Sequence, residues 1–515
     1  MLSIVYSAGL FGLDGFPVTV ECDASGTSLD EFELVGLPDA AVKEAKERVR
    51  SAAGNSGFAF PDCALTVNLA PADRRKEGSG FDVALLLGIL HASGELPAEI
   101  EFSHRCFVGE LSLSGELRGV RGALCMCLAA RDAGMTEFYA PAVNAEEAAA
   151  VADIKVYAVH NMAQLVAHLC GKEVLEPVPP RSHTAADVPT GGPDFCDVRG
   201  QVMAKRAMEI AAAGGHNILL IGPPGTGKSM LAKRLPSILP PLTFDEAVDA
   251  TKIHSVSGCL PEGHSLLTSR PFRSPHHTMS AVSLVGGGTY PTPGEISLAH
   301  NGVLFLDELP EFPKQVTDAL RQPLEDGQVT ITRASGRVTF PSSFMMVAAM
   351  NPCRCGYFGH PTRKCTCSPA SIHNYLAKIS GPMLDRFDIQ IELPSLTYDE
   401  ISGADATAET SAEVRQRVVA ARERAAVRMK DERGIYCNAQ MDAGQIHRYC
   451  VLDDGARELL RAAYDNLGLS ARGYDRLLRV ARTIADLDDA DVIGMTHVAE
   501  AVQLRSLDKK YWGEG

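Results

Sequence analysis

The pattern of hydrophobic and polar positions changes twice along the 515-residue chain. Up to about residue 170, short runs with β-like alternation take turns with helix-like runs that end at glycines. From residue 194 to about 394, continuous apolar runs alternate with helical patterns, which is typical of a parallel sheet covered on both faces. From about residue 399 onward the pattern predicts helices only. The chain therefore predicts three units of different architecture.

A segment rich in Pro, Gly, Ser and Thr at 176–193 separates the first two units. We expect an α+β unit at 1–172, a linker at 173–193, an α/β unit with a parallel sheet at 194–396, and a helical unit at 397–515.

Composition limits where the protein works and what it binds. The longest apolar run, at 83–90, is too short for a membrane helix, and the N-terminus has no basic leader. We therefore expect a cytoplasmic protein without a membrane partner. The formal charge of −15 argues against a surface that is basic throughout, so any contact with nucleic acid must come from a local basic patch.

A phosphate-binding loop is the strongest motif. After the strand-like run 217–221, the chain matches the pattern G-x-x-x-x-G-K-S and then continues as a helix. Backbone N–H groups of such a loop surround phosphate oxygens, while Lys228 would reach the β- and γ-phosphates and Ser229 would ligate Mg²⁺. The predicted nucleotide-binding residues are Gly222, Pro223, Pro224, Gly225, Thr226, Gly227, Lys228 and Ser229.

Two further apolar runs end in polar residues suited to hydrolysis. The first runs into Asp307, which would hold Mg²⁺, and Glu308, which would polarise the attacking water. The second ends in Asn351, which either orients that water or caps the following turn.

Four cysteines follow Asn351 within fifteen positions, as two Cys-x-Cys pairs: Cys353, Cys355, Cys365 and Cys367. Four thiolates suit tetrahedral Zn²⁺, although the Cys-x-Cys gap is tighter than usual. A structural metal and a metal-free loop both remain open, and His360 could replace one cysteine.

The order of motifs resembles the AAA+ ATPases of the magnesium-chelatase and MCM branch, and most closely the ComM/YifB family. The resemblance rests on the phosphate loop followed by "FLDE", "AAMNPC", "SGPMLDRFD" and "SARGYDRLLRVARTIADL", with "VGLPDAAVKEAKERVRSA" and "RPFRSPHH" elsewhere. It implies a hexameric ring with ATP and Mg²⁺ between subunits, and a helical lid at the C-terminus. By the same resemblance, Arg386 matches the arginine finger and Arg472 the second sensor, with Arg476 as a close competitor.

DNA is the partner that the resemblance implies, through branch migration of DNA in natural transformation. Residues 329–340 predict a β-hairpin with Arg333 and Arg337 beside its turn, at a position that projects into the ring's pore in this branch. An exposed hairpin with ordinary solubilising charges is the alternative. Residues 269–280 resemble the branch's helix-2 insertion and add Arg270 and Arg273 as DNA contacts, with His276 and His277 beside them.

The first unit resembles the Lon-protease fold of the ribosomal-S5-domain-2-like group. Active members use a Ser–Lys dyad. Here Gly80 stands at the serine's position, with Ser79 one residue early, and Leu124 stands at the lysine's, while Arg121 cannot serve as a base. We therefore expect a non-proteolytic domain.

The sequence as a whole predicts a ring-forming ATPase that moves along DNA, without sequence preference, on branched or single strands. The alternatives are a magnesium-chelatase motor subunit and a protein-remodelling ATPase without DNA activity.

Overall fold

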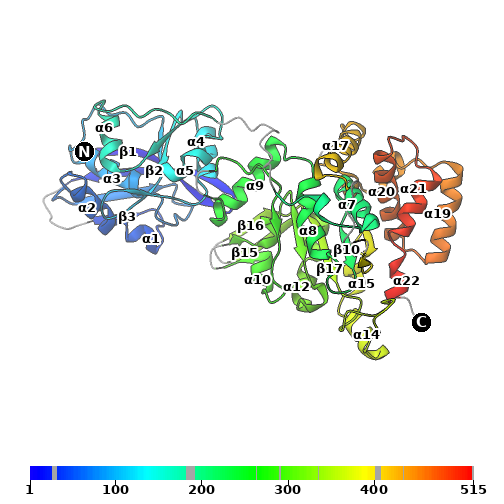
Figure 1. Ribbon diagram of the computed structural model, residues 1–515. Coiled ribbons are helices and arrows are strands. Elements are labelled where there is room, and N and C mark those ends of the chain that lie inside the picture. The colour runs from blue at the N-terminus through cyan, green and yellow to red at the C-terminus, as the bar shows by residue number, and fades with distance from the viewer. Residues whose placement is uncertain are drawn as a thin grey trace.

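The computed structural model describes residues 1–25, 32–180, 192–261, 264–288, 291–333, 336–398, 400, 408–432 and 434–512. Its N-terminal, central and C-terminal parts lie in a row (Figure 1). Most of the predicted linker, residues 181–191, lies outside the described residues, as do Ala334 and Ser335 of the predicted hairpin turn. No helix in the described ranges is long and apolar enough to cross a membrane.

The N-terminal part is a seven-stranded mixed sheet packed with helices, in the strand order β3-β4-β2-β1-β5-β8-β9. Helix α3 carries the apolar run at 83–90 and is buried along its whole length, which explains why that run has no polar face. The elements are β1 (Leu2–Phe11), β2 (Asp14–Ala24), β3 (Phe32–Val35), α1 (Ala40–Lys43), α2 (Ala45–Asn55), β4 (Leu65–Ala70), α3 (Asp82–Ala92), β5 (Arg105–Phe107), β6 (Glu110–Leu111), β7 (Leu117–Arg118), α4 (Ala123–Asp132), β8 (Glu137–Pro141), α5 (Ala142–Ala148), β9 (Lys155–Val159) and α6 (Met162–Leu169).

The central part is built on a five-stranded parallel sheet in the order β11-β14-β17-β10-β18, as the continuous apolar runs predict. Strands β10, β14 and β17 are buried at every position. The elements are η1 (Phe195–Asp197), α7 (Val202–Gly214), β10 (Ile218–Ile221), α8 (Lys228–Ile238), α9 (Phe244–Ser257), β11 (Phe272–Arg273), α10 (Ala281–Val285), β12 (Gly286–Gly287), β13 (Thr292–Pro293), α11 (Glu295–Leu298), β14 (Val303–Leu306), η2 (Leu309–Glu311), α12 (Lys314–Ala319), α13 (Arg321–Asp326), β15 (Gln328–Arg333), β16 (Gly336–Pro341), β17 (Met345–Met350), α14 (Pro369–Leu376), α15 (Gly381–Leu384) and β18 (Ile389–Glu392).

The C-terminal part consists of helices that lie beside the central part, where α17 and α20 pack against α7 and α17 also packs against α8 (Figure 1). Helix α20 lies at its centre and contacts α17, α21 and α7. The elements are α17 (Ser411–Arg428), η3 (Asn438–Gln440), α18 (Ala443–Tyr449), α19 (Asp454–Leu467), α20 (Ala471–Leu487), α21 (Met495–Gln503) and α22 (Leu507–Trp512).

The predicted hairpin at 329–340 forms as β15 and β16, with Val329 opposite Phe340 and Ile331 opposite Val338. The turn between β1 and β2 of the N-terminal part lies against this hairpin. A Cβ added at Gly336 would come within 2.8 Å of the Phe11 ring. The N-terminal part is therefore packed directly on the hairpin rather than held only through a linker.

The structure differs from the expectation for residues 269–280. Phe272 and Arg273 form β11, the edge strand of the central sheet, paired in parallel with β14. The insertion that follows (residues 286–293) is a separate small hairpin, β12–β13, which comes after α10. A strand of two residues is too short to show a period in the sequence.

Candidate nucleotide-binding site

The phosphate loop (residues 222–229) connects the end of β10 to the start of α8. Gly225 and Gly227 have φ values of +82° and +89°, the left-handed region that glycine adopts without strain. A Cβ at Gly222 would meet the backbone oxygen of Leu393 at 2.6 Å, so this position has no room for a side chain. Thr226 is buried and donates its hydroxyl to the oxygen of Pro223, which closes the turn.

Lys228 lies folded back along the loop. Its Nζ donates to the backbone oxygens of Gly222 at 2.6 Å and Pro223 at 2.8 Å, and to Oδ1 of Asn351 at 3.2 Å. Burial lowers the pKa of Lys228 to about 8, and the nearby carboxylates of Asp307 and Glu308 oppose that shift only in part. A bound polyphosphate would add negative charge beside this ammonium group and so favour its protonated form.

Ser229 and Asp307 lie close enough to share a cation. The Ser229 hydroxyl donates to Oδ2 of Asp307 at 2.7 Å. Serine and aspartate oxygens in this arrangement are suited to Mg²⁺, one through its hydroxyl and the other through water. Glu308, the next residue, has a positive φ of 54° and is 56% exposed, so its carboxylate faces open space beside the loop.

Sheet topology explains why these residues meet. In a parallel sheet all strands end at the same edge, and ligands bind there. Ile221 of β10 pairs with Met350 of β17, which brings Asn351 beside the phosphate loop. Leu306 of β14 pairs with Ala348 of β17, which brings Asp307 to the same edge.

His277 is a neighbour of this site that the sequence reasoning did not assign to it. Its Nδ1 lies 3.4 Å from Oε2 of Glu308. The preceding histidine turns elsewhere, since Nδ1 of His276 pairs with the Thr278 hydroxyl at 2.9 Å. In the sequence, only the adjacent pair "HH" after the edge strand could have indicated a histidine near this site. The pair does not show which of the two histidines faces it.

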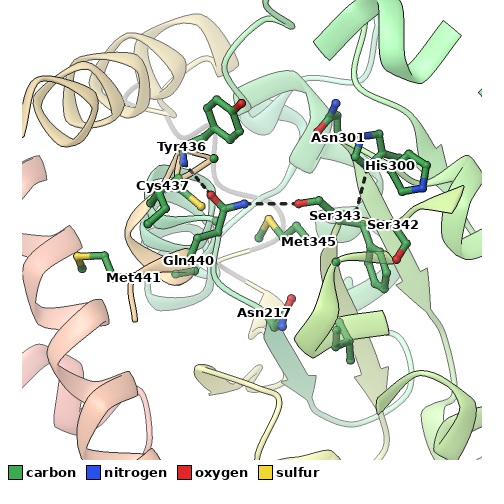
Figure 2. Close-up of a pocket in the computed structure, with 18 of the residues that line it drawn as sticks. Asn217, His300, Asn301, Ser342, Ser343, Met345, Tyr436, Cys437, Gln440 and Met441 are labelled. Atoms are coloured by element: carbon green, nitrogen blue, oxygen red, sulfur yellow. Dashed lines mark hydrogen bonds between the residues drawn. The ribbon is translucent and has the colours of Figure 1, made fainter. Parts of the chain in front are cut away.

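Arg386 and Arg472 lie at the opposite, amino edge of the sheet. Both line a cavity of about 880 Å³, here called the arginine hollow, between the central and C-terminal parts. Asn217, which precedes β10, and Met345, which begins β17, line the same hollow (Figure 2). Gln440 crosses it to donate to the Ser343 hydroxyl at 3.4 Å (Figure 2). The predicted finger and sensor therefore lie together, but across the sheet from their own chain's phosphate loop.

Three of the arginines that line the hollow differ in how they are held. Nη2 of Arg386 donates to Glu325 at 2.5 Å. Arg476 is buried and lies between Asp385 and Asp388, at 3.7 and 3.6 Å. Arg472, at the start of α20, is exposed. Of the two competing sensor candidates, Arg472 is thus the one that a ligand can reach.

Comparison with known proteins finds relatives that match nearly the whole chain. The family model of magnesium chelatase subunit ChlI matches residues 194–401, and two further models of the same subunit match 20–144 and its C-terminal region at 408–505. The chain is 44% identical to YifB of Salmonella typhimurium over 508 residues, covering 99% of this chain and 98% of YifB. It is 45% identical to the competence protein ComM of Haemophilus influenzae over 509 residues, covering 98% of each.

The chain belongs to the ComM/YifB family of magnesium-chelatase-like AAA+ proteins. Membership implies ATPase activity, with ATP and Mg²⁺ as the ligands. A more distant match, 23% identical over 206 residues, joins 37% of this chain to 20% of the DNA replication licensing factor Mcm2 of Drosophila melanogaster.

Within this family member, the four arginines expected at DNA fall into two classes. Arg270 donates to both carboxylate oxygens of Glu246, and Arg273 does the same to Glu295. Both are thus part of the folded core around β11, which argues against the expected DNA contact. Arg333 and Arg337 are exposed on the β15–β16 hairpin. Arg333 also donates to the backbone oxygen of Gly288, which lies between β12 and β13.

The four cysteines come together directly after Asn351, with their sulfurs all within 4.8 Å of one another. His360 does not take part. Its Nε2 pairs with the Ser395 hydroxyl at 2.8 Å, and its Nδ1 accepts from the backbone of Arg363. The expectation that His360 could replace a cysteine is therefore wrong.

In the N-terminal part, the two positions that the resemblance aligns with a protease dyad are Gly80 and Leu124, which carry no reactive group. Leu124 is buried in an apolar cluster that also includes Leu242 of the central part. Ser79 donates its hydroxyl to Glu110. Arg121 reaches toward the central part, where a Cβ on Gly258 would lie 3.1 Å from its Nε. The absence of proteolytic activity stays a prediction.

Proposed function

We propose that the protein is a ring-forming ATPase that couples ATP hydrolysis to movement along DNA, with branch migration as the reaction. Each nucleotide is bound by the phosphate loop of one chain and completed by the arginine hollow of the next. This proposal rests on the positions of Arg386 and Arg472 at the amino edge of the sheet. They lie opposite the carboxyl edge, which holds Lys228, Asp307 and Glu308.

The residues of the carboxyl edge divide the work of hydrolysis. Lys228 turns from its carbonyl partners toward the β- and γ-phosphates, which raises its pKa again. Ser229 and Asp307 hold Mg²⁺, which neutralises developing charge on the phosphates. Glu308 and Asn351 orient the attacking water on the γ-phosphate.

The arginines act from the neighbouring chain. In the isolated chain, the salt bridge with Glu325 occupies Arg386, and its Nε is buried without a partner among the described residues. Docking of a second chain would exchange the Glu325 carboxylate for a γ-phosphate oxygen. Since transition-state charge spreads over these oxygens, a guanidinium group placed there stabilises it directly. A hexameric ring, as the family resemblance implies, repeats this contact at each boundary.

DNA is proposed as the track on two grounds. Arg333 and Arg337 are exposed on a hairpin whose apolar face is fixed by the core, which suits sequence-independent contact with phosphates. Two relatives bear names that connect them to DNA or its uptake, the competence protein ComM and the replication licensing factor Mcm2.

The test is ATP turnover by the purified protein with and without a four-way junction, at two salt concentrations, beside Glu308→Gln. We expect strong stimulation by DNA that weakens with salt, because phosphate contacts release counterions. Glu308→Gln should lower turnover by about 10²- to 10³-fold while nucleotide binding persists. Branch-migration products on a labelled junction then distinguish movement from binding.

Turnover that is indifferent to DNA would contradict the motor proposal. It would favour a chelatase-type motor subunit or a protein-remodelling ATPase, and only the ATPase assignment would stand.

A further inference from the structure

The cysteine loop (residues 351–368) connects the sensor strand β17 to α14 without a helix or strand of its own. Its sulfurs nevertheless converge. The Sγ atoms of Cys353 and Cys355 are 3.4 Å apart, those of Cys353 and Cys365 are 3.7 Å apart, and those of Cys355 and Cys365 are 3.5 Å apart. Cys367 completes the set.

These separations match four ligands around one ion. Thiolates at about 2.3 Å from a central zinc lie about 3.8 Å from one another at the corners of a tetrahedron. The observed separations are much longer than the roughly 2.05 Å of a disulfide bond, and all four cysteines are free. Two zinc-bound Cys-x-Cys pairs would close the loop with a single bridge.

The closed loop contacts the phosphate loop. Gly356 lies between the two cysteine pairs and is buried, with φ at +86°. A Cβ added there would lie 2.5 Å from Cδ and 2.8 Å from Cγ of Pro224. The backbone of the cysteine loop therefore packs directly on a proline ring of the phosphate loop.

The same loop reaches the end of the chain. Phe358 packs edge-on against Tyr511 of α22, with ring centroids 6.3 Å apart. Tyr511 in turn donates to Glu392 at the end of β18. One loop thus contacts the phosphate loop and the C-terminal helix, and it begins at the sensor Asn351.

We propose that the four cysteines bind one Zn²⁺ and that the zinc-closed loop supports the phosphate loop through the contact of Gly356 with Pro224. Occupancy of the zinc site then sets nucleotide affinity. Zinc does no chemistry on ATP, because four thiolates leave no open position for water or substrate. The nucleotide half of this proposal rests on the proposed function, whereas the zinc half does not.

The first test is the metal content of the full-length protein purified without added metal. We expect about one zinc per chain, lost in Cys353→Ser and in Cys365→Ser and kept in Cys259→Ser, an exposed cysteine outside the loop. Iron at that ratio, or neither metal, would overturn the zinc assignment.

The second test separates the metal from the contact. Gly356→Ala places a methyl group against Pro224, whereas Gly359→Ala has a similar φ of +77° and open space around its Cβ. Both variants should keep zinc. Affinity for a fluorescent ADP analogue should fall about tenfold in Gly356→Ala, Cys353→Ser and Cys365→Ser, equal to about 1.4 kcal/mol. It should stay unchanged in Gly359→Ala and Cys259→Ser.

Equal nucleotide affinity in wild type, Gly356→Ala and the zinc-free variants would overturn the supporting role. If the wild type contained zinc but bound no nucleotide, the proposed function would fail and the supporting role with it, while the zinc assignment would stand.

Discussion

The two edges of the central sheet differ in how their polar groups are paired. At the carboxyl edge, Lys228, Ser229, Asp307 and Asn351 pair with one another, so the site is assembled within one chain. At the amino edge, Arg386 is held by a glutamate that is half exposed, and one buried nitrogen each of Arg386 and Arg476 makes no hydrogen bond to the described residues, although that of Arg476 lies 3.7 Å from Asp385. Unsatisfied buried donors are costly and call for an explanation. A site that is completed by a second chain explains them, because a ligand held between the two chains would accept these hydrogen bonds.

The largest expected effect comes from removing the finger at the amino edge. Arg386→Ala should lower ATP turnover by about 10³-fold, while nucleotide affinity of the isolated chain stays close to wild type, because Arg386 lies far from its own phosphate loop. Turnover assays and equilibrium binding of a fluorescent nucleotide measure the two quantities. Glu325→Gln is the matched control, since it frees Arg386 without removing it. A large loss of nucleotide affinity by the isolated Arg386→Ala chain would contradict the separation of the two edges.

The carboxyl edge should show a pH dependence of nucleotide affinity. In the free protein Lys228 loses its proton with a pKa of about 8, and binding requires the charged form. Affinity should therefore be constant well below pH 8 and fall above it, by about tenfold between pH 7 and pH 9. Titration calorimetry in buffers of different ionisation enthalpy should detect proton uptake near pH 8. Lys228→Arg is the control, because its charge does not change over this range.

Two arginines sharpen the contrast between core and DNA contacts. Arg270→Ala removes a carboxylate clamp and bonds to the oxygens of Pro240 and Asn301, so thermal unfolding should show a loss of about 2–3 kcal/mol. Arg337→Ala should leave stability unchanged, weaken binding to a four-way junction and reduce the slope of log affinity against log salt by about 1 per chain that contacts DNA. The reverse pattern would refute the placement of DNA on the hairpin.

The smallest effect is expected at His277. Its contact with the half-exposed Glu308 is worth at most about 1 kcal/mol, so His277→Ala should raise turnover without DNA by up to about fivefold, by freeing the carboxylate. Nucleotide affinity should not change. His276→Ala, which alters the neighbouring ring but no contact with Glu308, should match wild type. A fall in turnover in His277→Ala would show instead that the histidine positions Glu308 for hydrolysis.

The sequence predicted the parallel sheet and the location of the carboxyl edge, because apolar strands end directly in Asp307 and Asn351 and the phosphate loop follows a third. It also predicted the pairing faces of the hairpin. It could not predict the partners of Arg270 and Arg273, since Glu246 and Glu295 lie more than twenty positions away in separate helices. The packing of Phe11 on Gly336 joins segments over three hundred positions apart, and nothing local encodes it.

Subunit mixing tests the central claim most directly. Arg386→Ala has an intact phosphate loop and Glu308, whereas Glu308→Gln has an intact Arg386, and each should be nearly inactive alone. If sites form between chains, mixed oligomers contain boundaries with a wild-type Glu308 on one side and a wild-type Arg386 on the other. The account predicts that mixing restores turnover, with a maximum at intermediate ratios. Mixed oligomers that form, as shown by differently tagged chains purifying together, yet stay inactive at every ratio would contradict it.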